Sequence, residues 1–106
     1  MKASDSKKKE CQIIESIKHI LDLVSDDIKG YRIVLFGSRA TGDSRERSDF
    51  DIGVIGLKKL PLQIFYKIES LLDEIDTLYS IDFVDMHEVS ASFRSNALSK
   101  TEVLYG

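Results

Sequence analysis

Apolar residues in the first part of the chain recur at spacings of three and four. They are Ile13, Ile17, Ile20, Leu21 and Val24. This spacing puts them along one side of an α-helix, which we expect from about Lys9 to Ser25. Gly30 is a typical residue to close such a segment.

Three later apolar runs have the composition of β-strands. Tyr31–Phe36 is β-branched and aromatic and is bounded by glycines, which is typical of a strand buried on both faces. Phe50–Leu57 and Ile81–Met86 have similar compositions. Residues 37–48 form a polar segment with two glycines and three arginines. This segment is long for a simple connection, and such loops often carry function.

Helical spacing returns in two places. Pro61 suits the first turn of a helix, with a buried stripe expected at Leu62, Phe65, Ile68, Leu72, Ile75 and Leu78. Ser90 is a plausible N-cap of a final helix with apolar residues at Phe93, Ala97, Leu98 and Leu104. The order α, β, polar loop, β, α, β, α predicts a single α/β domain over residues 1–106, with helices packed on a small sheet and a flexible tail over residues 1–8.

Composition narrows the class of protein. The chain has 106 residues with 15 Lys and Arg against 18 Asp and Glu, so we expect a soluble protein that does not bind nucleic acid through a basic surface. The lone Cys11 forms no internal disulfide, and His19 and His87 add no zinc pattern, so we expect the reducing cytoplasm. No apolar run has the length of a signal peptide or membrane span, so no export or membrane anchor is expected.

Carboxylates at the start of the second strand suggest a metal site. Asp49 and Asp51 are two positions apart, and strand side chains alternate, so both project to one face. Asp82 lies inside an otherwise apolar run, where an ionised group is costly unless it is paired or coordinated. Hard oxygen ligands suit Mg²⁺, and three carboxylates can bridge two ions about 3.5–4 Å apart. Asp85 alternates away from Asp82, so we expect it to face elsewhere.

The turn after the first strand has the character of a phosphate site. Gly37 permits close approach of the backbone, and Ser38 adds a hydroxyl and an amide. Arg39, Arg45 and Arg47 could add positive charge against the phosphates of a nucleotide. A Gly-Ser turn or an Asp-x-Asp strand is common by itself, so the prediction depends on their combination.

At these residues the chain resembles the minimal nucleotidyltransferases of the DNA polymerase beta superfamily. Their pattern is Gly-Ser, a spacer, then Asp-x-Asp, and further segments are similar: Gly37–Ala40, Ser48–Ile52, Ile81–Asp85 and Val103–Tyr105. The resemblance implies a polymerase beta palm-like fold with a small mixed sheet flanked by helices. It also implies roles for individual residues: nucleotide binding by Gly37, Ser38, Arg39, Arg47 and Ser48, and magnesium binding and catalysis by Asp49, Asp51 and Asp82. Thr41 stands where many members carry Arg, so we expect weaker triphosphate binding.

The resemblance also implies a partner. Minimal members are typically antitoxins encoded with a helical HEPN ribonuclease toxin, so it implies transfer of AMP from ATP to a tyrosine hydroxyl of that toxin, with two Mg²⁺ ions and a hetero-oligomer. A chain of this length supplies a catalytic domain without a separate acceptor domain, which agrees with a partner that completes the site. Two alternatives are nucleotidylation of a small molecule and an antitoxin that acts by binding without catalysis.

Overall fold

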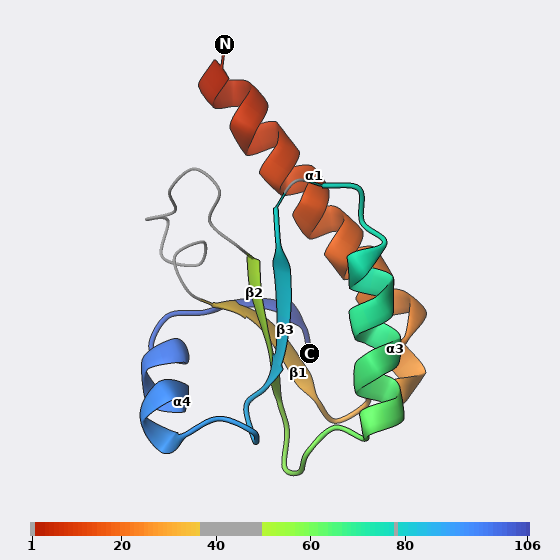
Figure 1. Cartoon of the computed structure of the whole chain (residues 1–106), viewed down its shortest axis with the longest axis vertical. Helices are drawn as coiled ribbons and strands as arrows, with labels where there is room; N and C mark the ends of the chain where they lie inside the picture. Colours follow the sequence, from red (N-terminus) through yellow and green to blue (C-terminus); the bar gives the residue numbers. More distant parts are fainter. Residues whose placement is uncertain (1, 37–49, 78) are drawn as a thin grey trace.

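The computed structural model describes residues 2–36, 50–77 and 79–106, with side chains from Glu10 on. Figure 1 shows the elements in chain order. They are α1 (Lys2–Leu23), the short 3-10 helix η1 (Ser25–Asp27), β1 (Arg32–Phe36), β2 (Phe50–Ile55), α3 (Leu62–Asp73), β3 (Ile81–Asp85), α4 (Ala91–Ala97) and β4 (Glu102–Tyr105). No helix in these ranges has the length and apolar character needed to cross a membrane.

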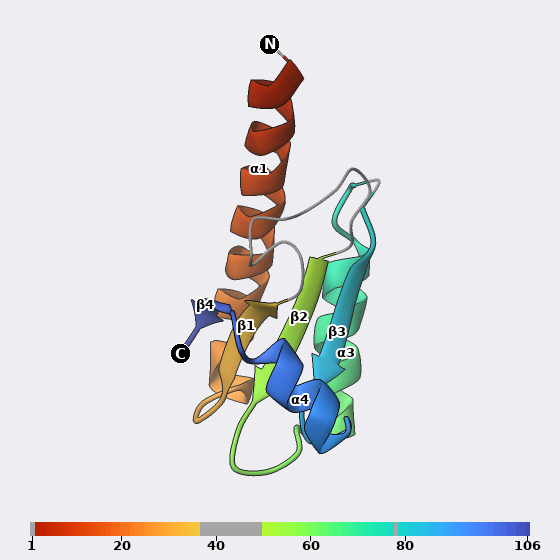
Figure 2. The same cartoon turned by 90° about the vertical axis from the view of Figure 1, so that its left-hand side faces the viewer.

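The strands form a mixed sheet in the order β3-β2-β1-β4. β1 is antiparallel to both β2 and β4, whereas β2 and β3 are parallel and are joined through α3. Helices α1 and α3 cover one face of the sheet, and α4 lies on the other (Figures 1 and 2). The predicted small mixed sheet flanked by helices is therefore confirmed.

The main core lies between the sheet and the pair α1 and α3. The predicted stripe of α1 is confirmed, because all five of its apolar residues are buried. From the sheet, alternate side chains of β1 and β2 enter this core: Ile33, Leu35, Phe50, Ile52 and Val54. Burial of Ile33 through Phe36 also confirms that β1 is covered on both faces.

The predicted start of the first helix and part of the predicted buried stripe of the second were wrong. Helix α1 begins at Lys2, not near Lys9, so the expected tail forms its first turns; Lys and Glu favour helix without an apolar face. In α3, Ile68 and Leu72 are buried as predicted, but Leu62 is 54% exposed. Its side chain lies off the stripe, and Ile64 and Leu71 pack on the core instead. Helix α3 ends at Asp73, before Ile75, and Leu78 lies outside the described residues.

The predicted end of the chain also needs correction. Ser90 does cap α4, accepting a hydrogen bond from the Phe93 N–H at 3.1 Å. The helix ends at Ala97, and Glu102–Tyr105 is a strand rather than a continuation of the helix. It pairs with β1, and Leu104 enters the core. A single buried residue in a four-residue strand leaves little periodicity to read, so the pairing with β1 decides its structure.

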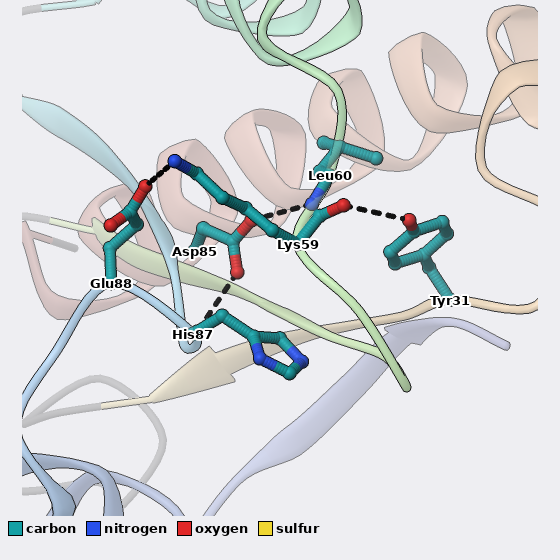
Figure 3. Close-up of polar contacts among 6 residues, drawn as sticks. All are labelled: Tyr31, Lys59, Leu60, Asp85, His87 and Glu88. Atoms are coloured by element: carbon teal, nitrogen blue, oxygen red, sulfur yellow. Dashed lines mark hydrogen bonds and ion pairs between the residues drawn. The ribbon is translucent and has the colours of Figure 1, made fainter.

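Asp85 ties two loops together at the far end of β3 (Figure 3). It is 4% exposed, and its carboxylate accepts hydrogen bonds from the Leu60 N–H at 2.8 Å and the His87 N–H at 2.9 Å. Next to this contact, the Lys59 ammonium group forms an ion pair with the Glu88 carboxylate. The hydrogen bond between these two groups raises the pKa of Lys59. Asp85 therefore fixes the loop after β2 to the loop after β3.

Candidate active site

Asp51 and Asp82 are brought together by the parallel pairing of β2 with β3. They are direct register partners on these strands. Phe50 and Phe83, their neighbours in sequence, point into the core, so the two aspartates project to the opposite face, on which α4 lies. Asp51 is half-buried and Asp82 is exposed. Two of the three predicted carboxylates thus lie side by side on one face of the sheet.

An open groove of about 930 Å³ surrounds this pair. Its remaining walls come from β1, β3, α3, α4 and the segment that follows α4. They are Phe36, Glu69, Asp73, Ile81, Phe83, Val84, Phe93, Asn96, Ala97, Ser99 and Lys100. Phe36 is the cross-strand partner of Asp51, so the aromatic wall begins next to the carboxylates.

The remaining predicted site residues lie outside the described part of the chain. They are Gly37, Ser38, Arg39, Arg47, Ser48 and Asp49. In sequence they connect Phe36 to Phe50, which end β1 and begin β2 on neighbouring strands. Their roles in binding phosphate and metal stay predictions.

The carboxylate pair fits a hard divalent cation. Adjacent strands are about 4.8 Å apart, so two ionised carboxylates on neighbouring strands repel each other unless a cation lies between or beside them. Both side chains line an accessible groove, and carboxylate oxygens are the donor type that Mg²⁺ prefers. No set of three or more possible ligands gathers among the described residues, and Asp49, the third predicted ligand, lies outside them.

Three other titratable residues, His19, His87 and Asp85, do not line this groove. His19 is exposed on α1. His87 follows β3, where its Nε2 lies 2.6 Å from the carbonyl oxygen of Gly56. Asp85 faces the core, which confirms the predicted alternation.

Sequence reasoning missed the groove residues contributed by helices. Glu69 and Asp73 of α3 and Phe93 and Asn96 of α4 all line the groove. Phe93 was expected only as a helix core residue, yet it is 45% exposed. The available signal was its position in the first turn of the helix, three residues after the N-cap Ser90 and three residues before Asn96.

Comparison with known families identifies the class. The family model described as "Polymerase beta, Nucleotidyltransferase" matches residues 15–106. This range contains the whole sheet and the carboxylate pair. The chain belongs to the polymerase beta nucleotidyltransferase family.

Two relatives give a finer comparison. The chain is 29% identical over 90 residues to the probable protein adenylyltransferase MntA of Haemophilus influenzae, covering 85% of this chain and 74% of the relative. It is also similar to a chain in a crystal structure of a toxin-antitoxin with AMP-PNP, at 26% identity and a TM-score of 0.62, covering 85% of this chain and 73% of that one.

A third similarity concerns the fold alone. The complex of a tri-AMPylated Shewanella oneidensis HEPN toxin with its MNT antitoxin contains a chain with a TM-score of 0.58 at 24% identity. The match covers 86% of this chain and 70% of that one. The sheet and its flanking helices are therefore shared with an antitoxin of this type.

Proposed function

We propose that the chain is a Mg²⁺-dependent protein adenylyltransferase that transfers AMP from ATP to a tyrosine hydroxyl of a HEPN-type ribonuclease toxin and thereby acts as its antitoxin. The observation that carries this proposal is the register pairing of Asp51 with Asp82 in an open groove. Family membership and similarity to an adenylyltransferase supply the reaction class.

The roles of the chain's residues follow from their positions. Asp51 and Asp82, with Asp49, would hold two Mg²⁺ ions, which supply charge neutralisation and lower the pKa of the acceptor hydroxyl. The half-buried Asp51 lies on β2, which has a paired strand on each side, and this position would hold its carboxylate in place for the bound ion. In the transfer, the acceptor oxygen bonds to the α-phosphorus, the bond to pyrophosphate breaks, and the hydroxyl proton passes to solvent.

The open groove supports a protein acceptor. Both Asp82 and the rim of the groove are accessible from solvent, so a side chain on another protein can reach the carboxylates. The toxin-antitoxin and HEPN complexes found for similar chains support a HEPN partner and a hetero-oligomer. We place the reaction in the cytoplasm, where ATP and the RNA targets of such a toxin occur.

A transfer assay tests the proposal. The chain is incubated with Mg²⁺, ATP labelled at the α-phosphate, and a HEPN protein from the same organism; label should appear on a tyrosine of that protein. The double variant Asp51→Asn, Asp82→Asn should give no label, whereas Asp22→Asn, which changes an exposed carboxylate on α1, should label normally. Absence of label with the unmodified chain and a folded toxin would reject the proposal.

The same assay separates two other functions. If the double variant still neutralises the toxin in cells, the antitoxin acts by binding rather than by transfer. If label appears on a small hydroxylated molecule and not on the toxin, the acceptor is small. Either outcome contradicts the proposed protein acceptor.

A further inference from the structure

We propose that Phe93 and Asn96 of α4 bind the adenine base of the donor nucleotide. This inference rests on the proposed function, because it assigns the base of ATP to one end of the same groove. It adds contacts to the base that the carboxylate site does not provide. Both residues are described, and both line the groove together with Asp51 and Asp82.

The first step is the distance from the carboxylates to Phe93. Asp82, Asp51 and Phe36 are successive register partners across β3, β2 and β1, and all three side chains lie on the same face. Neighbouring strands are about 4.8 Å apart, so this row spans roughly 10 Å. The ring of Phe93 follows, with its centroid 6.1 Å from that of Phe36. A nucleotide whose α-phosphate lies at the carboxylates has only its ribose between that phosphate and its base, so the base reaches the aromatic end.

Phe93 is held in an orientation that suits stacking. Its ring meets that of Phe36 at 87°, an edge-to-face contact. Helix α4 is fixed at its start by the Ser90 cap and along its length by a hydrogen bond from Arg94 Nε to the Met86 carbonyl oxygen at 2.8 Å. Phe93 nevertheless remains 45% exposed in the groove. A rigid, exposed aromatic surface of this kind binds a planar base.

Asn96 supplies the polar complement. It follows Phe93 by three positions, so the two residues lie on the same side of α4. Its side chain is exposed and makes no hydrogen bond to another described residue. An asparagine amide offers one acceptor and one donor, which match the amino group and adjacent ring nitrogen of adenine in a bidentate contact. Guanine presents its ring N1–H and its exocyclic amino group as two adjacent donors, a pair that the two acceptor oxygens of a carboxylate satisfy better than an amide does.

Nucleotide binding to the isolated chain tests the stacking role. By calorimetry with Mg²⁺ and a non-hydrolysable ATP analogue, Phe93→Ala should raise the Kd about 5- to 100-fold, and Phe93→Trp should restore binding. Inorganic tripolyphosphate, which has no base, should bind both proteins equally. Val103→Ala, which removes a similarly exposed apolar side chain outside the groove, should leave the Kd unchanged. An unchanged analogue Kd for folded Phe93→Ala would overturn the proposal.

Asn96→Asp tests base selection without removing packing. A carboxylate accepts two hydrogen bonds and suits the two donors of guanine, so the ratio of ATP to GTP affinity should fall about 10-fold or more. Ser95→Asp adds the same charge at a neighbouring exposed position outside the groove and should leave the ratio unchanged. An equal change of both affinities, or an unchanged ratio, would contradict adenine recognition by Asn96.

Failure of this inference is distinct from failure of the proposed function. If the unmodified chain labels the toxin and the Phe93 and Asn96 variants keep its ATP affinity and selectivity, only the base site is rejected. If the unmodified chain binds no nucleotide, both proposals are rejected.

Discussion

Asp51 and Asp82 are register partners in a parallel pair of strands, with both carboxylates on the same face of the sheet. Like charges directly opposite each other on neighbouring strands destabilise a fold. We therefore expect the arrangement to lower stability where no cation offsets the two charges. Removing the charge of one of the two carboxylates should therefore lower the activity and raise the stability.

Asp82→Asn should show this opposition. We expect AMP transfer to fall at least about 100-fold, because a metal ligand is lost. In EDTA the same variant should be more stable by roughly 0.5–1 kcal/mol, because a repulsion is relieved. Denaturant unfolding in EDTA measures the second effect, with Asp22→Asn as the control on α1. A variant that loses both activity and stability would indicate a structural role for Asp82 instead.

Mg²⁺ should stabilise the folded chain through the carboxylate pair. At a Mg²⁺ concentration ten times the Kd, linkage predicts a gain of about 1.4 kcal/mol in the free energy of unfolding. The gain should disappear in Asp51→Asn, Asp82→Asn, whereas K⁺ at matched ionic strength should give no gain in either protein. Thermal unfolding across a Mg²⁺ series provides the measurement, and an equal gain in both proteins would place the cation elsewhere.

Asp85 should matter for stability through its two backbone hydrogen bonds. Asp85→Ala leaves the N–H groups of Leu60 and His87 without their acceptor, so we expect a loss of about 2–4 kcal/mol. Asp26→Ala removes a carboxylate that is 94% exposed and should change stability by less than about 0.5 kcal/mol. Urea unfolding compares the two variants, and equal small losses would mean that water replaces the contact.

Leu104 should report whether β4 belongs to the core. Leu104→Ala is expected to cost about 2–4 kcal/mol because Leu104 is buried beside α1 and β1, whereas Val103→Ala, at 49% exposed, should cost less than about 1 kcal/mol. Equilibrium unfolding measures both. A similar small cost for the two would argue against strand pairing at this end.

Local patterns in the sequence were sufficient to predict the elements that pack through a continuous apolar stripe. The α1 stripe, the first strand and the Ser90 cap follow from spacing and side-chain chemistry within a few residues. The shared face of Asp51 and Asp82, by contrast, is set by the register of β2 with β3, which neither strand encodes alone. The phosphate turn and Asp49 lie outside the described residues, so that half of the site is still a prediction.

Features that depend on distant partners were not predictable in this way. Glu102–Tyr105 is a strand because β1 offers it an edge, and no pattern within four residues encodes that pairing. Phe93 lines the groove because α4 crosses the face that carries Phe36, far away in sequence. In both cases tertiary contacts override a weak local preference.

The pairing of β1 with β4 also has a consequence for how quickly the native sheet can form. Leu35 pairs with Ile52 on one side and with Glu102 on the other. Strand β1 therefore pairs with β2, which is near in sequence, and with β4, which is far away in sequence. Closing the longer connection carries the larger entropic cost, and mixed topologies with such contacts fold more slowly than helical ones. We expect a refolding intermediate with β1 to β3 in place and β4 still undocked, which would leave one side of β1 open to self-association until the last strand arrives.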